Sequence, residues 1–187
     1  MAMRMIIRIL LFALVFSFWA HAEDVIPGVV TFIPPTGFDA FRPGGDPGDN
    51  PFDGVGQLRE YLSHDGKQID INARLIGFST GEGKRLTYRQ LDDAGVKQEM
   101  LDFAKSLPNI TNMTAVAEAK LGGQKAFSFT FHAIVRDYGI HLYGDIYWVR
   151  VDTNRVVEVE LSTHSDAALV ELRKSLTGFK IKKSYSK

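Results

Sequence analysis

Apolar and polar residues alternate without a break between Ala126 and Val135, and this is the clearest pattern in the chain. One set is Phe127, Phe129, Phe131, Ala133 and Val135, and the set between them is Ser128, Thr130, His132 and Ile134. Because successive side chains of a strand point to opposite faces, the pattern predicts a strand with one buried face. The segments Ile140–Arg150 and Arg155–Leu161 also have strand patterns, so we expect a three-stranded antiparallel meander.

Further strands are predicted on both sides of this meander. Val29–Ile33 is rich in β-branched residues and ends at two prolines, which cannot donate hydrogen bonds to a sheet. Gln57–Leu62 and Gln68–Ile76 are expected to form a hairpin, since an Asp-Gly pair lies in the turn between them. Ala115–Leu121 leads through two glycines into the meander, and residues 179–181 could add a last extended segment.

Two helices are predicted. The first is expected to begin at Thr87, which forms a capping box with Gln90, and to end at Pro108. Its apolar stripe is Val96, Met100, Phe103, Ala104 and Leu107. The second is capped by Thr163 or Ser165 and runs to about Thr177. Helices combined with a run of antiparallel strands predict the α+β class, an antiparallel sheet packed by helices.

Composition restricts the function classes. The chain has 187 residues, 45% hydrophobic and 24% charged, with a formal net charge of zero and no cysteine. These values are typical of a globular domain and give no electrostatic reason to expect a nucleic-acid partner. Without cysteine there is no disulfide, thiolate metal site or cysteine nucleophile. The segment Gly81–Lys84 lacks the other residues of a phosphate-binding loop, and no cofactor is expected.

The N-terminal segment has the organisation of a secretory signal peptide. Arg4 and Arg8 precede the apolar run Ile9–Trp19, and residues 20–22 form a small-x-small cleavage site. The apolar run is about half of the ~20 residues that a spanning helix needs. We therefore expect cleavage after Ala22, a periplasmic or secreted location, no membrane span after cleavage, and a single domain over residues 23–187.

The segment 34–56 is rich in glycine and proline and is predicted to be a long loop. Asp46, Asp49 and Asp53 lie in it, but their spacing differs from the alternate-residue spacing of an EF-hand loop. A solvated, turn-rich loop is the simpler interpretation, and no metal site is expected there. A loop of this length in a compact domain is either functional or mobile.

Strand pairing places the polar residues of the meander together. If the first turn is centred on residues 137 and 138, Phe127 lies opposite Trp148 and Phe129 opposite Ile146, which leaves one face apolar. If the second turn is centred on residues 153 and 154, Val159 lies opposite Trp148. The polar face then holds the candidate site residues His132, His141, Tyr143, Asp145, Tyr147, Glu158 and Glu160.

Three interpretations of this polar face are open. It could be solvated or helix-covered, with cross-strand hydrogen bonds only. It could be a recognition surface, because aromatic side chains with polar tips on a rigid sheet suit a protein partner or small ligand. It could hold a metal or catalytic site that uses His132, His141 and a carboxylate. A Ser128–His132–Asp145 triad lacks the strand-to-helix elbow and the oxyanion hole of hydrolases.

The chain resembles the PsbP/DcrB-like family of exported α/β/α sandwich proteins. The resemblance rests on the opening strand followed by Pro34–Phe38, on the turn Leu121–Ala126 that leads into long paired strands, and on the closing helix Leu172–Phe179. It implies a non-catalytic accessory domain, with no shared catalytic residues. We therefore expect an exported binding domain; the alternatives are a metal-dependent hydrolase using His132 and His141, or a purely structural envelope component.

Overall fold

The computed structural model describes residues 22–41, 56–80, 86–135 and 138–182. The strands are β1 (Glu23–Ile26), β2 (Val30–Phe32), β3 (Phe38–Phe41), β4 (Gly56–Ser63), β5 (Gln68–Leu75), β6 (Phe78–Thr80), β7 (Leu86–Tyr88), β8 (Ile110–Met113), β9 (Ala117–Leu121), β10 (Gln124–Val135), β11 (Ile140–Arg150), β12 (Arg155–Thr163) and β13 (Phe179–Ile181). The helices are α2 (Asp93–Ser106), α3 (Asp166–Lys174) and the 3-10 turn η1 (Ser175–Gly178).

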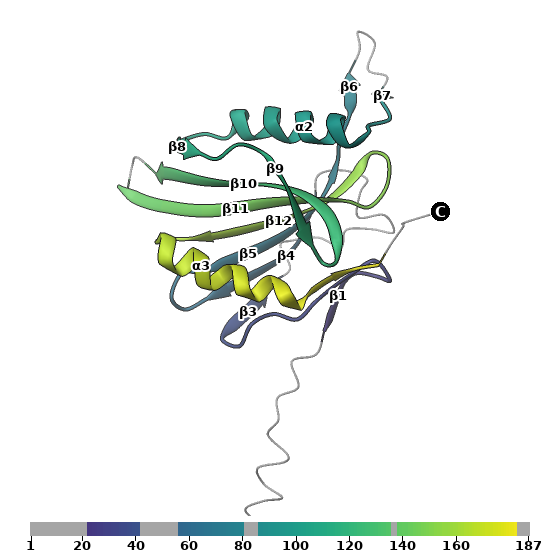
Figure 1. The fold of residues 1–187 in the computed structure, drawn as a ribbon. Helices are drawn as coiled ribbons and strands as arrows, with labels where there is room; N and C mark the ends of the chain where they lie inside the picture. The colour runs from purple at the N-terminus through teal and green to yellow at the C-terminus, as the bar shows by residue number, and fades with distance from the viewer. Residues whose placement is uncertain (1–21, 42–55, 81–85, 136–137, 183–187) are drawn as a thin grey trace, which may run out of the picture.

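Within the described residues, eight strands form one large sheet. Its order is β3-β4-β5-β12-β11-β10-β8, and β9 pairs with the part of β10 that β8 leaves free. Neighbouring strands are antiparallel throughout. A smaller sheet joins β1, β2 and β13, and β6 pairs with β7 in a separate hairpin. The long strands β10, β11 and β12 lie in the middle of the molecule (Figure 1).

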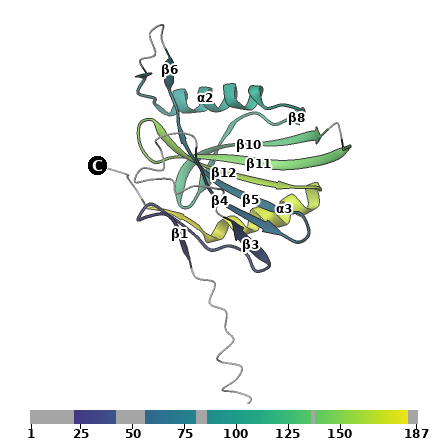
Figure 2. The same cartoon turned by 180° about the vertical axis from the view of Figure 1, so that it is seen from behind.

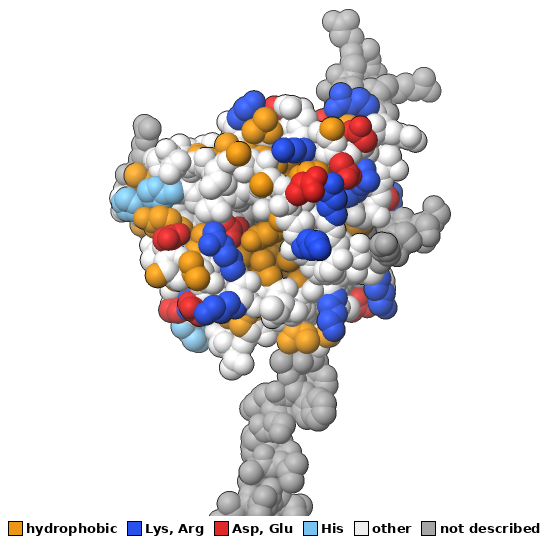
Figure 3. All heavy atoms as spheres, in the orientation of Figure 1, with side chains coloured by type: hydrophobic (Ala, Val, Ile, Leu, Met, Phe, Trp, Pro, Cys, Tyr) orange, Lys and Arg blue, Asp and Glu red, His pale blue; other side chains and the backbone are white. Residues whose placement is uncertain are grey.

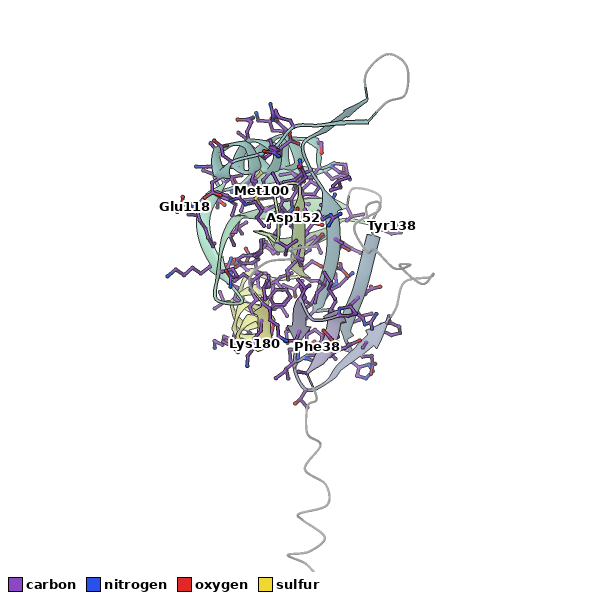
Figure 4. All side chains as sticks on the ribbon, turned by 90° about the vertical axis from the view of Figure 1, so that its right-hand side faces the viewer. Phe38, Met100, Glu118, Tyr138, Asp152 and Lys180 are labelled. Atoms are coloured by element: carbon purple, nitrogen blue, oxygen red, sulfur yellow. The ribbon has the colours of Figure 1, made fainter. Side chains whose placement is uncertain are left out.

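Helix α2 covers one face of the large sheet. Its residues Val96, Met100 and Ala104 are buried against Phe129 and Trp148, among others of the same cluster. Figure 4 labels Met100 on the α2 side of the molecule, well away from Phe38 on β3. The apolar stripe predicted for this helix is therefore its packing face, and the phenylalanine face of β10 is the surface on which it packs.

The opposite face is covered by α3 and the small sheet. Leu169 and Leu172 of α3 belong to a second cluster with Ile69, Ile71 and Leu161, all of them buried. Figures 1 and 2 show α2 and α3 on opposite sides of the strands in both views. The predicted α+β class is confirmed, and the sheet is packed on both faces.

Several predicted elements are confirmed in detail. Residues 126–135, 140–150 and 155–161 form the three strands of the meander. The β4–β5 hairpin is present, and β10 pairs with β11 in the predicted register, with Phe127 opposite Trp148. Ser165 caps α3 by accepting a hydrogen bond from the Ala168 amide at 3.2 Å. The last segment, β13, extends the small sheet by pairing with β2.

The predicted register between β11 and β12 is wrong by one residue. Trp148 lies opposite Glu158 rather than Val159. The turn contains an extra residue because the Asp152 side chain accepts hydrogen bonds from the amides of Asn154 and Arg155, both at 3.0 Å. Since a shift of one residue exchanges the two faces of a strand, Glu158 and Glu160 lie on the α2 face, and the predicted polar face divides into two.

Other differences concern element ends. Helix α2 begins six residues later than predicted, with Asp92 as its cap, because Thr87 pairs in β7. The predicted loop 34–56 contains β3, and β8 forms where no strand was predicted. The signal peptide, apart from Ala22, and the loop acids Asp46, Asp49 and Asp53 lie outside the described residues. Among the described helices, none is long and apolar enough to cross a bilayer.

Candidate functional site

Two histidines meet at the end of the sheet where β10 and β11 are joined. His132 Nε2 lies 2.9 Å from His141 Nδ1, and the two rings are nearly parallel, with an interplanar angle of 15°. The His132 ring also stacks on Tyr143, with centroids 4.5 Å apart. His132 Nδ1 is bonded to the Thr111 hydroxyl of β8 at 2.9 Å. Three strands therefore hold the imidazole of His132 in place.

His132 of this pair borders a surface hollow of about 220 Å³. The hollow lies between β8, β10, β11 and the start of α3, and is lined by Asn112, Met113, Thr114, Thr130, Phe131, His132, Tyr143 and Asp166. At the same end of the sheet, Tyr138 is 77% exposed and Ile140 is 41% exposed. Figure 3 shows histidine side chains gathered with apolar ones at this edge of the molecule. Aromatic, apolar and polar groups thus share one accessible surface.

Asp145 has a structural partner on α3. Asp145 is 2% exposed, and its carboxylate accepts hydrogen bonds from Arg173 Nε at 2.5 Å and Nη2 at 2.9 Å. It also accepts from Thr130 at 2.6 Å. The bond to Asp145 raises the pKa of Arg173 further above its ordinary value, and burial beside Asp145 raises the pKa of Tyr147 to about 12. Asp145 and Tyr147 therefore hold α3 on the sheet and are not free for a ligand.

Glu158 and Glu160 lie on the α2 side of the sheet, away from the histidines. The buried Glu158 carboxylate accepts from the Trp148 indole at 2.8 Å and from Asn72 at 3.0 Å, and pairs with Arg74. Burial, together with the charge of Glu158, raises the pKa of Glu160 to about 7. The seven predicted residues thus form three groups, and only His132, His141 and Tyr143 combine accessibility with mutual contact.

A metal site at the histidine pair is not supported by the described residues. No three His, Asp or Glu side chains among them converge as metal ligands. His132 Nε2 and His141 Nδ1 form a hydrogen bond with each other, so these two nitrogens are occupied. A zinc site needs three or four convergent ligands, so the hydrolase alternative lacks its third ligand in the described part of the chain.

Sequence reasoning missed two residues that define the site. Thr111 lies on the edge strand β8 and locks His132, and Arg173 lies on α3 and neutralises Asp145. Thr111 belongs to a short polar segment without strand periodicity. Arg173 lies in the last turn of a helix, where a basic residue suits the helix dipole whether or not it has a partner. Both contacts join segments far apart in the sequence, so no local pattern indicates them.

No protein-family model and no characterised protein sequence matches the chain. Solved structures do. LpqN of Mycobacterium tuberculosis, whose structure is described as that of a protein involved in cell envelope biogenesis, aligns with a TM-score of 0.56 and 16% identity over 84% of this chain and 86% of LpqN. A point mutant of Mog1 aligns with a TM-score of 0.51 and 12% identity over 87% of this chain and 96% of Mog1.

A third match is cyanobacterial PsbP from Synechocystis, with a TM-score of 0.47 and 15% identity over 82% of this chain and 86% of that protein. The two matches above a TM-score of 0.5 define the fold as Mog1/PsbP-like. The resemblance predicted from the sequence is therefore confirmed at the level of the fold. At these identities the likeness describes architecture, and function has to be argued from the site.

Proposed function

We propose that this chain is an exported, non-catalytic binding domain of the cell envelope. Its recognition surface is the end of the sheet formed by His132, His141, Tyr143, Tyr138 and Ile140, which we call the histidine tip. The observation that carries the proposal is the preformed His132–His141–Tyr143 cluster beside a hollow of about 220 Å³. Rigid, partly exposed aromatic groups lose little conformational entropy on binding, which favours recognition.

The partner that suits this surface best is a protein segment. Tyr138 and Ile140 expose apolar area at the same end of the sheet as the hydrogen-bonding histidines, the mixture found at protein interfaces. The hollow of about 220 Å³ can accept a side chain of a partner, and it is smaller than a small-molecule site of about 300–1,000 Å³. The fold likeness to LpqN, a protein linked to cell envelope biogenesis, supports an accessory role.

An exported location is part of the same proposal. The predicted cleavage site after Ala22 immediately precedes β1, whose first residue, Glu23, pairs with Arg59 and accepts a hydrogen bond from the buried Tyr61 at 2.7 Å. Cleavage there would leave every residue of β1 in the mature domain, which we take to span residues 23–187. Mass spectrometry of the exported protein should give Glu23 as its first residue, and a start inside β1 would contradict this assignment.

Site-specific photocrosslinking in the host envelope tests the recognition surface. A photoreactive amino acid at position 138 is expected to capture a defined protein, whereas the same group at position 97, an exposed residue of α2, is expected not to capture it. Ile140→Ser should reduce the crosslinking yield because it removes apolar area from the histidine tip.

The matched control is Val170→Ser on α3. Val170 is 46% exposed and Ile140 41%, so the two changes remove similar apolar surface at different places. Val170→Ser should leave the yield unchanged. If the two substitutions have equal effects, or if position 97 captures the same protein as efficiently, the histidine tip is not the recognition surface. If neither position captures anything, the structural-component alternative is favoured.

A further inference from the structure

The hydrogen bonds around His132 determine which of its nitrogens carries the proton. Thr111 Oγ1 lies 3.0 Å from the His132 carbonyl oxygen and 2.9 Å from His132 Nδ1. A carbonyl oxygen only accepts, so the single hydroxyl proton of Thr111 is donated to it. At the ring the hydroxyl must then accept, and Nδ1 of His132 carries the hydrogen. In neutral His132 the other nitrogen, Nε2, is therefore an acceptor.

This assignment extends to His141. Because His132 Nε2 accepts, the bond of 2.9 Å between the rings is donated by His141 Nδ1. The ring centroids are 5.1 Å apart and the planes are nearly parallel, so the two nitrogens lie almost on the line that joins the rings. Neutral His141 consequently keeps the lone pair of its Nε2, on a side chain that is exposed. The chain Thr111–His132–His141 ends in an acceptor.

Protonation turns this acceptor, Nε2 of His141, into a donor and keeps the hydrogen bonds that link Thr111, His132 and His141. A first proton adds to His141 Nε2 and leaves the bond between the rings in place, now charge-assisted. That bond can also shift the charge to His132, where the Tyr143 face stacked on the ring stabilises a cation. A second proton would set two N–H groups against each other across 2.9 Å. The geometry of the pair therefore accommodates one proton beyond the neutral state and disfavours a second.

We infer that the histidine tip recognises a protein segment that presents a carboxylate beside an apolar side chain, and that it does so in acidic conditions. This inference rests on the proposed function and adds the chemistry of the partner. The protonated His141 Nε2–H donates to the carboxylate, and Tyr138, which is 77% exposed at the same end of the sheet, contacts the apolar side chain. At neutral pH the lone pair of Nε2 faces the carboxylate instead and weakens the complex. Histidine is the side chain whose charge normally changes between about pH 5 and 8.

The surrounding groups agree with uptake of a single proton. In the described part of the chain, α3 contributes Asp166, which lines the same hollow as His132 and whose negative charge favours a positive pair. Strand β11 contributes Tyr143, and strand β8 contributes only uncharged groups such as Thr111. The Asp145–Arg173 pair further along β11 is neutral as a unit. Asp166 lies on the hollow side, and His141 is not part of the hollow's lining, so a carboxylate at His141 approaches from another direction.

Nitrogen-15 spectra of the histidine rings test the assignment first. At about pH 7.5 both His132 and His141 are expected to carry their hydrogen on Nδ1. Thr111→Val should release the lock and populate the other form of His132. A hydrogen on His141 Nε2 in the neutral protein would overturn the inference.

Binding of a capped Leu-Glu-Leu tripeptide, followed by chemical-shift titration, tests the recognition. We expect affinity at least about tenfold higher near pH 5.5 than near pH 7.5, the effect of about 1.4 kcal/mol. The matching Leu-Gln-Leu peptide should show little pH dependence. His141→Gln should abolish the difference, while His164→Gln, a change of an exposed histidine after β12, should preserve it.

Equal binding of the acidic peptide at both pH values, or an unchanged pH dependence in His141→Gln, would refute the inference. Amide spectra of each variant confirm that the fold is retained. These outcomes separate from those of the crosslinking experiment. Crosslinking at position 138 that is insensitive to pH and to His141→Gln would leave the recognition surface in place and remove only its proton dependence.

Discussion

Removal of Arg173 is expected to destabilise the protein far more than its surface position suggests. The Asp145 side chain is 3% exposed, whereas the Arg173 side chain that neutralises it is 36% exposed. In Arg173→Ala the carboxylate keeps the Thr130 hydroxyl at 2.6 Å and the distant Tyr147 hydroxyl at 3.4 Å, and loses both guanidinium bonds. A buried charge left without its partner typically costs about 3–5 kcal/mol. We expect a loss of about 3 kcal/mol because two hydroxyl donors remain.

The reciprocal change should cost less. In Asp145→Asn the guanidinium of Arg173 can turn towards water, so only one charged hydrogen-bonding unit is lost, at about 1–2 kcal/mol. The comparison therefore tests whether the free energy of unfolding falls more when the buried anion loses its cation than when the half-exposed cation loses its anion. Urea denaturation at neutral pH, followed by tryptophan fluorescence, measures both free energies of unfolding.

Lys174→Ala is the matched control. Lys174 follows Arg173 in the sequence, its side chain is 69% exposed, and it forms a surface pair with Glu171. Exposed pairs of this kind contribute about 0.5 kcal/mol or less. Hydrogen exchange of the α3 amides should accelerate in Arg173→Ala and not in the control. If Arg173→Ala costs less than about 1 kcal/mol, or less than Asp145→Asn, the Asp145–Arg173 pair is not what fastens α3 to the sheet.

Three further predictions concern the rest of the fold. Glu160 has a pKa raised to about 7 by burial and by Glu158, so the stability due to its protonated form is complete below about pH 4.5 and is lost as the pH rises through about 7. Glu160→Gln should therefore be more stable than the wild type by about 1–3 kcal/mol at pH 8 and similar to it at pH 4, measured by urea denaturation. Gly144→Ala should destabilise strongly, by about 3 kcal/mol or more, because the added methyl group would lie 2.4 Å from the Phe131 ring; a shift of thermal midpoint of less than about 4 °C would contradict this. Asp92→Ala should cost about 1 kcal/mol, since Asp92 caps the N-terminus of α2; thermal unfolding measures it, and Asp92→Asn should restore most of the loss.

The meander was predictable because its periodicity is strong and its first register is set by a fully apolar face. Phe127 and Trp148 could be paired from the sequence, since a shift of one residue would turn Trp148 to the face opposite Phe127. The second register could not be derived in the same way. Strand β12 is buried on both faces, so Val157 and Glu158 give no clear preference for either. The contact that decides this register is made by the Asp152 side chain, which accepts a hydrogen bond from the Arg155 amide in a turn one residue longer than predicted.

The remainder of the site depended on contacts that no periodicity encodes. The pairing of His132 with His141 follows from the first register, and the structure brings the rings into direct contact. Thr111 reaches His132 from an edge strand too polar to be recognised as a strand. Arg173 reaches Asp145 from a helix whose exposed face gave no indication of a buried partner. Such contacts are determined by how helices and edges pack on the sheet, which is a tertiary property.

The division of the polar residues of the meander has a consequence for function. A buried carboxylate whose oxygens are occupied by protein donors cannot bind a partner without losing bonds that stabilise the fold, and this is the situation of Asp145 and Glu158. His141 is different, because its ring satisfies one nitrogen within the protein and keeps the other accessible. Binding of a partner to His141 would break no bond within the fold, and this is why we propose the histidine tip as the recognition surface.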